Sequence, residues 1–209
     1  MLFLFSFLLL CKTIPKSIQI TEQVSESLIS MLKNDEIDIA LIVTPVNDDS
    51  LVAHPIFYEE FFVYTSHQHK MYDQVEINPA TLKTDGLWIL NEGHCFRNQT
   101  LDICNVKEPN SFESRVKYES GSLETLKKLV DKQGGFTLLP ELVTFDLDKN
   151  DKTKLRKFKN PVPTREVSLL VKKSFLKQKA VKALHAEILK NLPPTFVSEK
   201  KSNVINVKY

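Results

Sequence analysis

The chain contains little glycine, few cysteines and almost no net charge, and each of these scarcities excludes a class of protein. Only five of its 209 residues are glycine, so the sequence is neither repetitive nor of low complexity. Three cysteines are too few, and odd in number, for a secreted scaffold held together by disulfides. A formal charge of +2 lacks the clustered basic excess of a dedicated nucleic-acid-binding domain. The length suits one large or two small domains of a globular protein.

The apolar run that opens the chain, from Met1 to Leu10, is too short to cross a bilayer, which takes roughly 18 to 20 residues. It also lacks the basic start of a secretory signal, because the first positive charge is Lys12. Leu10 is too large for the position before the cysteine of a bacterial lipoprotein signal. We therefore expect a cytoplasmic protein without a membrane partner.

Patterns typical of strands and of helices alternate along the chain. Helices are predicted behind the expected N-caps Ser25 and Ser122, ending at Asn34 and Gly134, and again over residues 174–192. The alternation predicts an α/β protein with largely parallel sheets, and the charged, proline-broken stretch 146–163 is expected to cross between two lobes. The polar tail after Pro194 is expected to be loose. Strands are predicted at residues 18–20, 37–43, 54–58, 61–65, 87–90, 115–119, 136–139 and 167–171.

The segment 93–104 carries the chemistry, because it holds Cys95 and Cys104 in polar, basic company. Cys95 follows a predicted strand and lies near a helix start, where unpaired backbone N–H groups favour an anion. His94 and Arg97 add positive or hydrogen-bonding character beside it. Cys95 is therefore a candidate activated thiol, whereas its surroundings say little about Cys104.

Helix geometry indicates what this pair of thiols can do. If residues 95–104 form one helix, nine steps of about 1.5 Å separate the two ends by roughly 13 Å. A disulfide requires Cα atoms within about 7 Å of each other. Oxidation would then have to unwind the helix, with sulfenic acid forming first on Cys95 and Cys104 capturing it. The spacing favours a conformational switch over a structural crosslink.

The run Gly93-His94-Cys95-Phe96-Arg97-Asn98-Gln99, followed by Cys104, closely resembles the sensing loop of the OxyR-type, peroxide-responsive LysR-type transcriptional regulators. The resemblance extends over roughly residues 12–192, since 12–22 and 122–140 resemble segments of the same family. It implies two Rossmann-like lobes of the type II periplasmic-binding-protein kind. Lobe I would comprise residues 1–60 with 163–209, and lobe II residues 61–162 with the redox cysteines.

The resemblance also implies roles for single residues. Without the resemblance, Ser25 is most simply an N-cap, a role that can coexist with another, and His94 is more often a surface or loop residue. Arg165 is explained equally well as an ordinary surface charge. Family members often carry Asp where this chain has Asn98. No metal or other cofactor is implied, and the spacing of His54, His67 and His69 specifies no metal site. The implied roles are peroxidatic thiol for Cys95, resolving thiol for Cys104, peroxide pocket for His94, Asn98 and Ser25, and thiolate stabilisation for Arg165.

As a whole, the resemblance implies the regulatory domain of a transcriptional activator and not an enzyme. Its implied partners are hydrogen peroxide, further copies of the chain in a dimer or tetramer, and a reductant of the glutaredoxin or thioredoxin type. The family's winged helix-turn-helix, linker helix and first sensing-domain strand are not in this sequence. Promoter DNA and RNA polymerase would therefore be contacted only through a longer parent protein.

Two other functions fit the residues. The first is a periplasmic solute-binding protein of the same fold, with residues 1–10 as its export signal. The second is a thiol peroxidase, which would turn over peroxide repeatedly with a reductant, whereas a sensor reacts once per reduction cycle.

Overall fold

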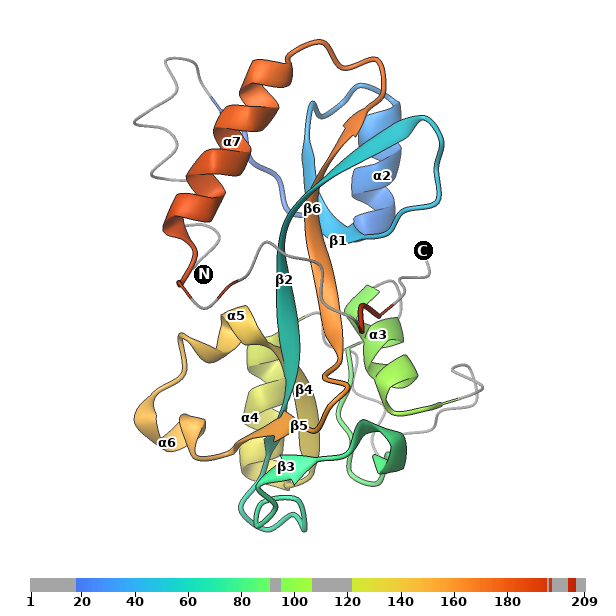
Figure 1. Ribbon diagram of the computed structural model, residues 1–209. Helices are drawn as coiled ribbons and strands as arrows, with labels where there is room; N and C mark the ends of the chain where they lie inside the picture. Colours follow the sequence, from blue (N-terminus) through green and yellow to red (C-terminus); the bar gives the residue numbers. More distant parts are fainter. Residues whose placement is uncertain (1–17, 91–94, 107–121, 195, 197–202, 206–209) are drawn as a thin grey trace. The chain divides into compact units, whose positions relative to one another are not determined.

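The computed structural model describes residues 18–90, 95–106, 122–194, 196 and 203–205, which belong to two compact units. Unit 1 comprises the chain up to Tyr58 together with Glu166–Lys200, and unit 2 comprises Glu59–Arg165 together with Lys201–Lys208. The strands β2 and β6 each contribute residues to both units (Figure 1). The apolar run 1–10, Cys11, His94 and the predicted strand at 115–119 lie outside the described residues.

Helices and strands are interspersed along the chain, and in the described part no helix is long and apolar enough to span a membrane. In chain order the elements are α2 (Ser25–Lys33), β1 (Ala40–Thr44), β2 (Leu51–Thr65), β3 (Glu76–Ile77), a 3-10 turn (Pro79–Thr81), α3 (Cys95–Ile103), α4 (Leu123–Gln133), β4 (Phe136–Pro140), α5 (Glu141–Thr144), α6 (Lys149–Lys152), β5 (Leu155–Phe158), β6 (Thr164–Lys172) and α7 (Gln178–Asn191).

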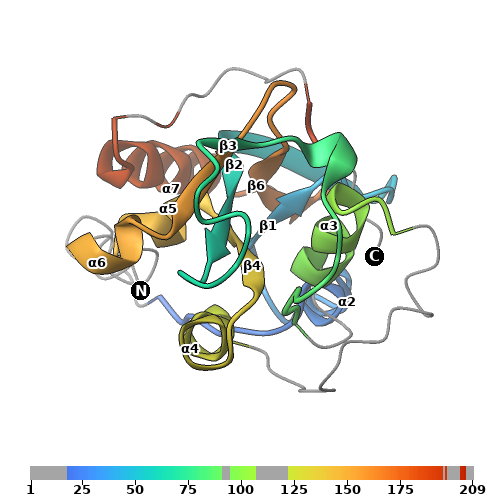
Figure 2. The ribbon, with the colours of Figure 1, turned by 90° about the horizontal axis from the view of Figure 1, so that it is seen from below.

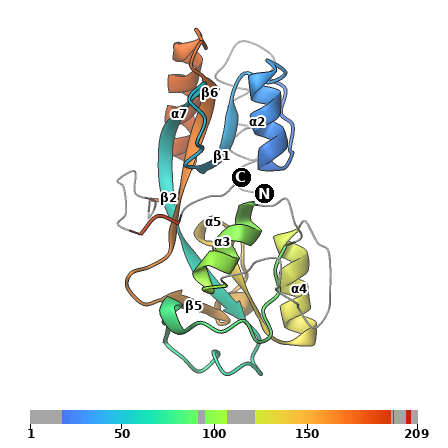
Figure 3. The ribbon, with the colours of Figure 1, turned by 90° about the vertical axis from the view of Figure 1, so that its right-hand side faces the viewer.

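Unit 1 is a sheet covered by one helix on each face. Strand β6 lies between β1 and β2, and it runs antiparallel to β1 with Leu170 opposite Ala40. Successive residues of a strand point to opposite faces, so neighbouring residues of β6 meet different helices. Leu169 packs in the cluster that contains Val181 of α7, whereas Leu170 packs with Leu32 of α2. The helices α7 and α2 therefore cover opposite faces of the strands, as Figure 3 shows.

Unit 2 is built around the second half of β2, which pairs with β4 and with β5, while β5 also pairs with β3. One face carries Phe61 of β2 and Leu138 of β4, and Phe96 and Cys104 from α3 and its end pack onto it. The other face carries Tyr64, in a cluster with Val130 of α4. Viewed from below in Figure 2, α3 and α4 stand on two sides of these strands.

The expected α/β architecture is confirmed, but the prediction of largely parallel sheets is wrong. Strands β4 and β5 run in the same direction, as helix-connected strands in an α/β unit do. Strand β2 inserts between them and runs antiparallel to both. The predicted break between residues 58 and 61 is also absent, since β2 continues through Glu59, whose buried carboxylate pairs with Arg165.

Some predicted element positions are also wrong, because an apolar run does not always reflect pairing with a neighbouring strand. Residues 18–20 form no strand, and Ile20 is half exposed. Residues 87–90 are apolar because Leu87 and Leu90 are buried in the core, and only a single bridge joins Leu87 to Phe136. The last helix begins at Gln178 and not at residue 174, and the crossing segment contains α6 and β5.

The chain returns to unit 2 near its C-terminus, where the sequence predicts a loose tail. Thr164 N–H donates to the Asn203 carbonyl at 3.1 Å, and Ile205 N–H donates to the Thr164 carbonyl at 2.7 Å. The Asn203 side chain also donates to the carbonyl of Pro161 at 3.2 Å. Ile205 packs against the core cluster that contains Phe96 and Cys104. Residues 203–205 therefore extend unit 2 by one short parallel bridge.

A partly buried ionic network joins α4, α6 and β2 in unit 2. Lys154 Nζ donates to Asp131 at 2.7 Å, to Asp151 at 3.1 Å and to the hydroxyl of the fully buried Tyr64 at 3.2 Å. Lys127 also forms ion pairs with both of these carboxylates. Burial opposes ionisation of the two aspartates, but the bonds from Lys127, Lys154 and Tyr64 outweigh it and hold the pKa of each carboxyl below its usual value.

We expect Lys154→Met to lower the free energy of unfolding by about 2 kcal/mol at neutral pH, because Asp131 and the buried Asp151 keep only Lys127 as a cationic partner. Urea denaturation followed by circular dichroism measures this loss.

The contribution of the network to stability depends on pH. In the unaltered protein the network stabilises the folded state fully above the unfolded aspartate pKa of about 3.9, and this stabilisation is lost as pH falls through the lower pKa of the folded state. The acid-induced loss should therefore be smaller in Lys154→Met, and equal neutral stability of the two proteins would contradict a stabilising role.

Candidate redox site

The two cysteines of the segment 93–104 lie at opposite ends of α3. Cys95 is the first residue of the helix, and Cys104 directly follows its last residue. Cys104 N–H donates to the Thr100 carbonyl at 3.0 Å, so helical hydrogen bonding continues through Cys104. Nine helical steps separate the two Cα atoms by about 13 Å, beyond the roughly 7 Å that a disulfide allows. Both residues are present as thiols, with no disulfide between them.

The C-terminal end of α3 is fixed by its backbone. Asn105 adopts a left-handed conformation with φ of 57°, which turns the chain out of the helix. Val106 N–H then donates back to the Leu101 carbonyl at 3.0 Å, the bond that characterises a Schellman end. The Asn105 side chain donates to the Pro79 carbonyl at 2.9 Å. These bonds hold Cys104 where the helix ends.

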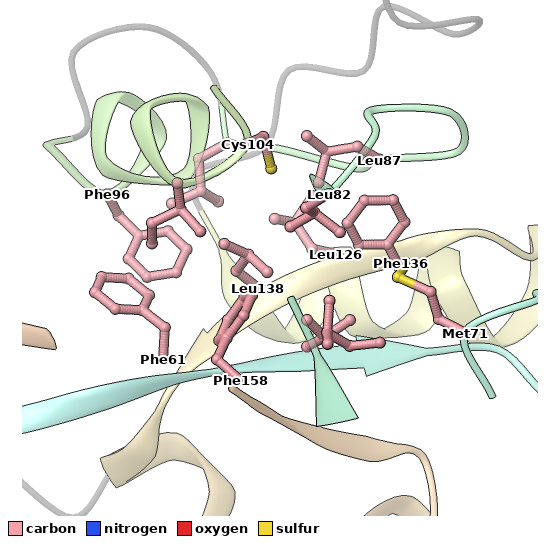
Figure 4. Packing of buried hydrophobic residues seen from close by; sticks show 14 residues of the cluster. Phe61, Met71, Leu82, Leu87, Phe96, Cys104, Leu126, Phe136, Leu138 and Phe158 are labelled. Carbon is pink, nitrogen blue, oxygen red and sulfur yellow. The ribbon is translucent and has the colours of Figure 1, made fainter. Parts of the chain in front are cut away.

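Cys104 is a core residue in this state. Its side chain belongs to the apolar cluster with Phe136 and Leu138, and only 5% of the residue is exposed. Figure 4 shows its sulfur directed from the end of α3 towards that cluster. Burial raises the pKa of the Cys104 thiol to about 12, because an apolar surrounding disfavours the thiolate. The thiolate is the reactive form, so Cys104 is inert while it stays in the core.

Cys95 differs from Cys104 because it is only half-buried. Arg97, two residues further on, donates from its guanidinium to the Leu90 carbonyl at 3.2 Å. This bond ties the first turn of α3 to the chain before the helix. The two thiols therefore differ in accessibility: one can meet a small solute in water and the other cannot.

Arg165 lies against the aromatic residue that follows Cys95. Its guanidinium carbon is 5.5 Å from the ring centre of Phe96 and 5.9 Å from that of Phe61, and the two rings stack at 5.7 Å. Arg165 Nε donates to Glu59 at 2.7 Å, and the Glu59 carboxylate is fully buried. Leu142 N–H donates to the other oxygen of that carboxylate at 3.1 Å. The arrangement places a cation next to the first turn of α3, and the Glu59 carboxylate forms an ion pair with that cation.

The structure brings some of the predicted site residues together on α3. Cys95, Asn98 and Cys104 all lie on or at the end of α3, and Arg165 contacts Phe96. Ser25 belongs to unit 1, where it is the first residue of α2; the N-cap is Val24, so the N-cap prediction is wrong by one residue. Ser122 is the N-cap of α4 as predicted, and Gly134 ends that helix. In the described ranges no group of His, Cys, Asp and Glu residues could hold a metal ion.

Glu59 and the stack of Phe61 on Phe96 are features of this site that the sequence does not predict. A signal for Glu59 was present, because Glu59 and Glu60 interrupt a long apolar extended run. A carboxylate in the middle of a buried strand requires a partner, and Arg165 is that partner. The aromatic stack had no comparable signal, since it joins residues 35 positions apart.

The α/β fold and a family match define the class of the protein. Residues 16–193 match the LysR substrate binding domain, so the chain belongs to that family. Among its relatives are a probable hydrogen peroxide-inducible genes activator of Streptomyces viridosporus, 28% identical over 87% of this chain, and the hydrogen peroxide-inducible genes activator of Haemophilus influenzae, 28% identical over 71%. These alignments cover 59% and 48% of the relatives, so the chain spans about half of their length.

Solved structures show the same likeness. OxyR from Porphyromonas gingivalis superposes with a TM-score of 0.85 at 27% identity, covering 99% of this chain and 93% of that one. The reduced form of the OxyR regulatory domain from Pseudomonas aeruginosa superposes with a TM-score of 0.76 at 28% identity, covering 90% and 91%. The chain is thus similar to OxyR regulatory domains in both sequence and fold.

The difference in burial predicts a difference in alkylation. In the native, reduced protein we expect iodoacetamide to modify Cys95 at least about tenfold faster than Cys104, because only an exposed thiolate reacts. Peptide mapping by mass spectrometry at successive times distinguishes the two sites, which lie nine residues apart. In urea the two rates should converge. Equal rates in the native protein would show that Cys104 leaves the core readily.

Proposed function

We propose that this chain is the hydrogen-peroxide-sensing regulatory part of a LysR-type transcriptional activator, switched by a Cys95–Cys104 disulfide. One observation carries the proposal: a half-buried thiol and a core thiol stand at opposite ends of one nine-residue helix. Membership of the LysR substrate binding domain family and relatives named as peroxide-inducible activators support it. The relatives are regulators, which favours a sensor over an enzyme.

The proposed chemistry uses one peroxide and two thiols. The Cys95 thiolate attacks one oxygen of hydrogen peroxide, the O–O bond breaks, and hydroxide leaves to be protonated to water. The product is a sulfenic acid on Cys95. The Cys104 sulfur, as thiolate, then attacks the Cys95 sulfur, an S–S bond forms and a second hydroxide leaves. Peroxide is reduced to two waters, and the two thiols are oxidised to one disulfide.

The second step requires a change of fold in unit 2. The two Cα atoms must approach from about 13 Å to within about 7 Å, so α3 cannot persist as one helix. Cys104 must also leave the cluster that it shares with Phe136 and Leu138. The chemical event is thereby converted into a rearrangement of a packed core, which is what a regulator needs in order to pass a signal to bound DNA.

The remaining predicted roles form part of the same proposal. His94, Asn98 and the Ser25 hydroxyl would hold peroxide, and Arg165 would stabilise the Cys95 thiolate. Residues 1–60 with 163–209 would form lobe I and residues 61–162 lobe II; units 1 and 2 divide the chain a few residues away from these boundaries, and residues 201–208 belong to unit 2. In a longer cytoplasmic protein the domain would act as a dimer or tetramer, contact DNA and RNA polymerase through the other parts, and be reset by a glutaredoxin- or thioredoxin-type reductant.

Treatment of the full chain with one equivalent of peroxide should consume two thiols and yield a 95–104 linkage in a non-reducing peptide map. We expect Cys104→Ser to stop at a sulfenic acid on residue 95, trapped with dimedone, and Cys95→Ser to abolish both products. Cys11→Ser is the control and should behave as the unaltered chain does. Absence of the linkage would refute the switch, and repeated turnover with thioredoxin or glutathione would instead identify a peroxidase.

The role of Arg165 can be separated from its structural pairing with Glu59. The double variant Arg165→Met with Glu59→Gln removes the cation without leaving a buried carboxylate unpaired. We expect dimedone trapping on residue 95 to slow by about tenfold, because the cation no longer stabilises the thiolate. Arg156→Met is a matched control, since Arg156 also stacks on an aromatic ring of unit 2, that of Tyr72. An unchanged rate in the double variant would exclude this role for Arg165.

A further inference from the structure

Gln99 lies in the middle of α3 and is fully buried, yet neither atom of its side-chain amide has a hydrogen-bond partner. In the part of the chain that the structure describes, single side-chain atoms of His54 and Ser66 share this property, but Gln99 leaves both a donor and an acceptor unsatisfied. A buried amide normally finds partners, because taking it out of water without them is costly. An orphaned amide in the core of a stable helix therefore calls for an explanation.

The neighbouring polar residues show that the cost is confined to Gln99. Thr100 is equally buried, but its hydroxyl donates to the Phe96 carbonyl at 2.9 Å. Asn105, beyond the helix, directs its amide to the Pro79 carbonyl. These two polar side chains that follow Gln99 are thus satisfied, and an apolar residue at position 99 would not carry this penalty.

The position of Gln99 determines what the penalty acts on. Gln99 stands four residues after Cys95 and five before Cys104, inside the segment that the proposed disulfide must unwind. When α3 opens, the amide gains access to water or to the backbone groups that the helix releases. The penalty therefore applies to the closed helix of the reduced state and is relieved in the opened segment.

We infer that Gln99 is a conformational bias built into α3, which destabilises the reduced helix and so favours the 95–104 disulfide. The inference rests on the proposed function and adds to it the residue that tunes the equilibrium. It assigns Gln99 no contact with peroxide, because the bias acts on the second step, when Cys104 must reach the sulfenic acid on Cys95. Replacement of the amide by an apolar group of similar length should make the reduced form harder to leave.

Gln99→Met tests the inference, since methionine is unbranched, apolar and close to glutamine in size. In reducing buffer we expect Gln99→Met to unfold at higher urea concentration than the unaltered chain, the opposite of most core substitutions. In glutathione redox buffers its disulfide equilibrium constant should fall roughly tenfold, the size expected for one unsatisfied buried group. A tenfold change corresponds to a reduction potential about 30 mV less negative.

Two controls separate the possible causes. Thr100→Val replaces a satisfied buried polar group in the same helix, so it should raise neither the stability nor the potential. Dimedone trapping in a Cys104→Ser background isolates the first step, and there Gln99→Met should react at the unaltered rate. A slower first step with an unchanged potential would mean that the amide serves peroxide, and would overturn the inference.

The outcomes also distinguish this inference from the function on which it rests. If the unaltered chain forms the 95–104 disulfide but Gln99→Met is no more stable and has the same potential, the inference fails and the switch stands. A Gln99→Met variant that folds poorly would likewise contradict it. If the unaltered chain forms no such disulfide, both fall together.

Discussion

The length of α3 sets the separation of the two thiols, and the other features of the site take their meaning from that separation. A helix is a stiff spacer, because each residue adds a fixed rise and backbone hydrogen bonds must break before the two ends can approach each other. Cys95 and Cys104 occupy the two ends of this spacer. Two thiols are therefore compatible with the helix as it stands, and a covalent bond between them is not.

The core of unit 2 makes the same constraint cooperative. Cys104 shares its cluster with residues from β2, β4 and α4, so its departure disturbs contacts well beyond α3. Phe96, at the other end of the helix, stacks on Phe61 of β2 and lies under Arg165, which is anchored by the buried Glu59. Both ends of α3 are thus held by tertiary contacts as well as by backbone hydrogen bonds. Because protein cores are close-packed, a helix held in this way adopts discrete arrangements and does not deform gradually.

Much of the site could be predicted from the sequence because its signals are local. The cysteine spacing and the helix ending at Gly134 follow from short patterns in neighbouring residues, whereas the segment behind Cys95 is predicted only as a helix or a loop. The features that escaped prediction depend on contacts between distant segments. Strand β2 continues through Glu59 because Arg165 neutralises the Glu59 carboxylate, and Arg165 lies more than a hundred positions further along the chain. The orphaned amide of Gln99 is likewise invisible in the sequence, since a glutamine beside Asn98 reads as an ordinary polar helix residue until its surroundings are known.

The return of residues 203–205 to unit 2 bears on the modularity of the protein. Unit 2 is not a continuous insertion between two crossings of the chain, because it takes a short piece from the far end of the sequence. A fragment cut at Glu59 and Arg165 would lose the bridge to Thr164 and the contribution of Ile205 to the cluster that holds Cys104. Helix α3 and residues 203–205 are therefore parts of one folding unit, although about a hundred residues and the whole of α7 separate them along the backbone.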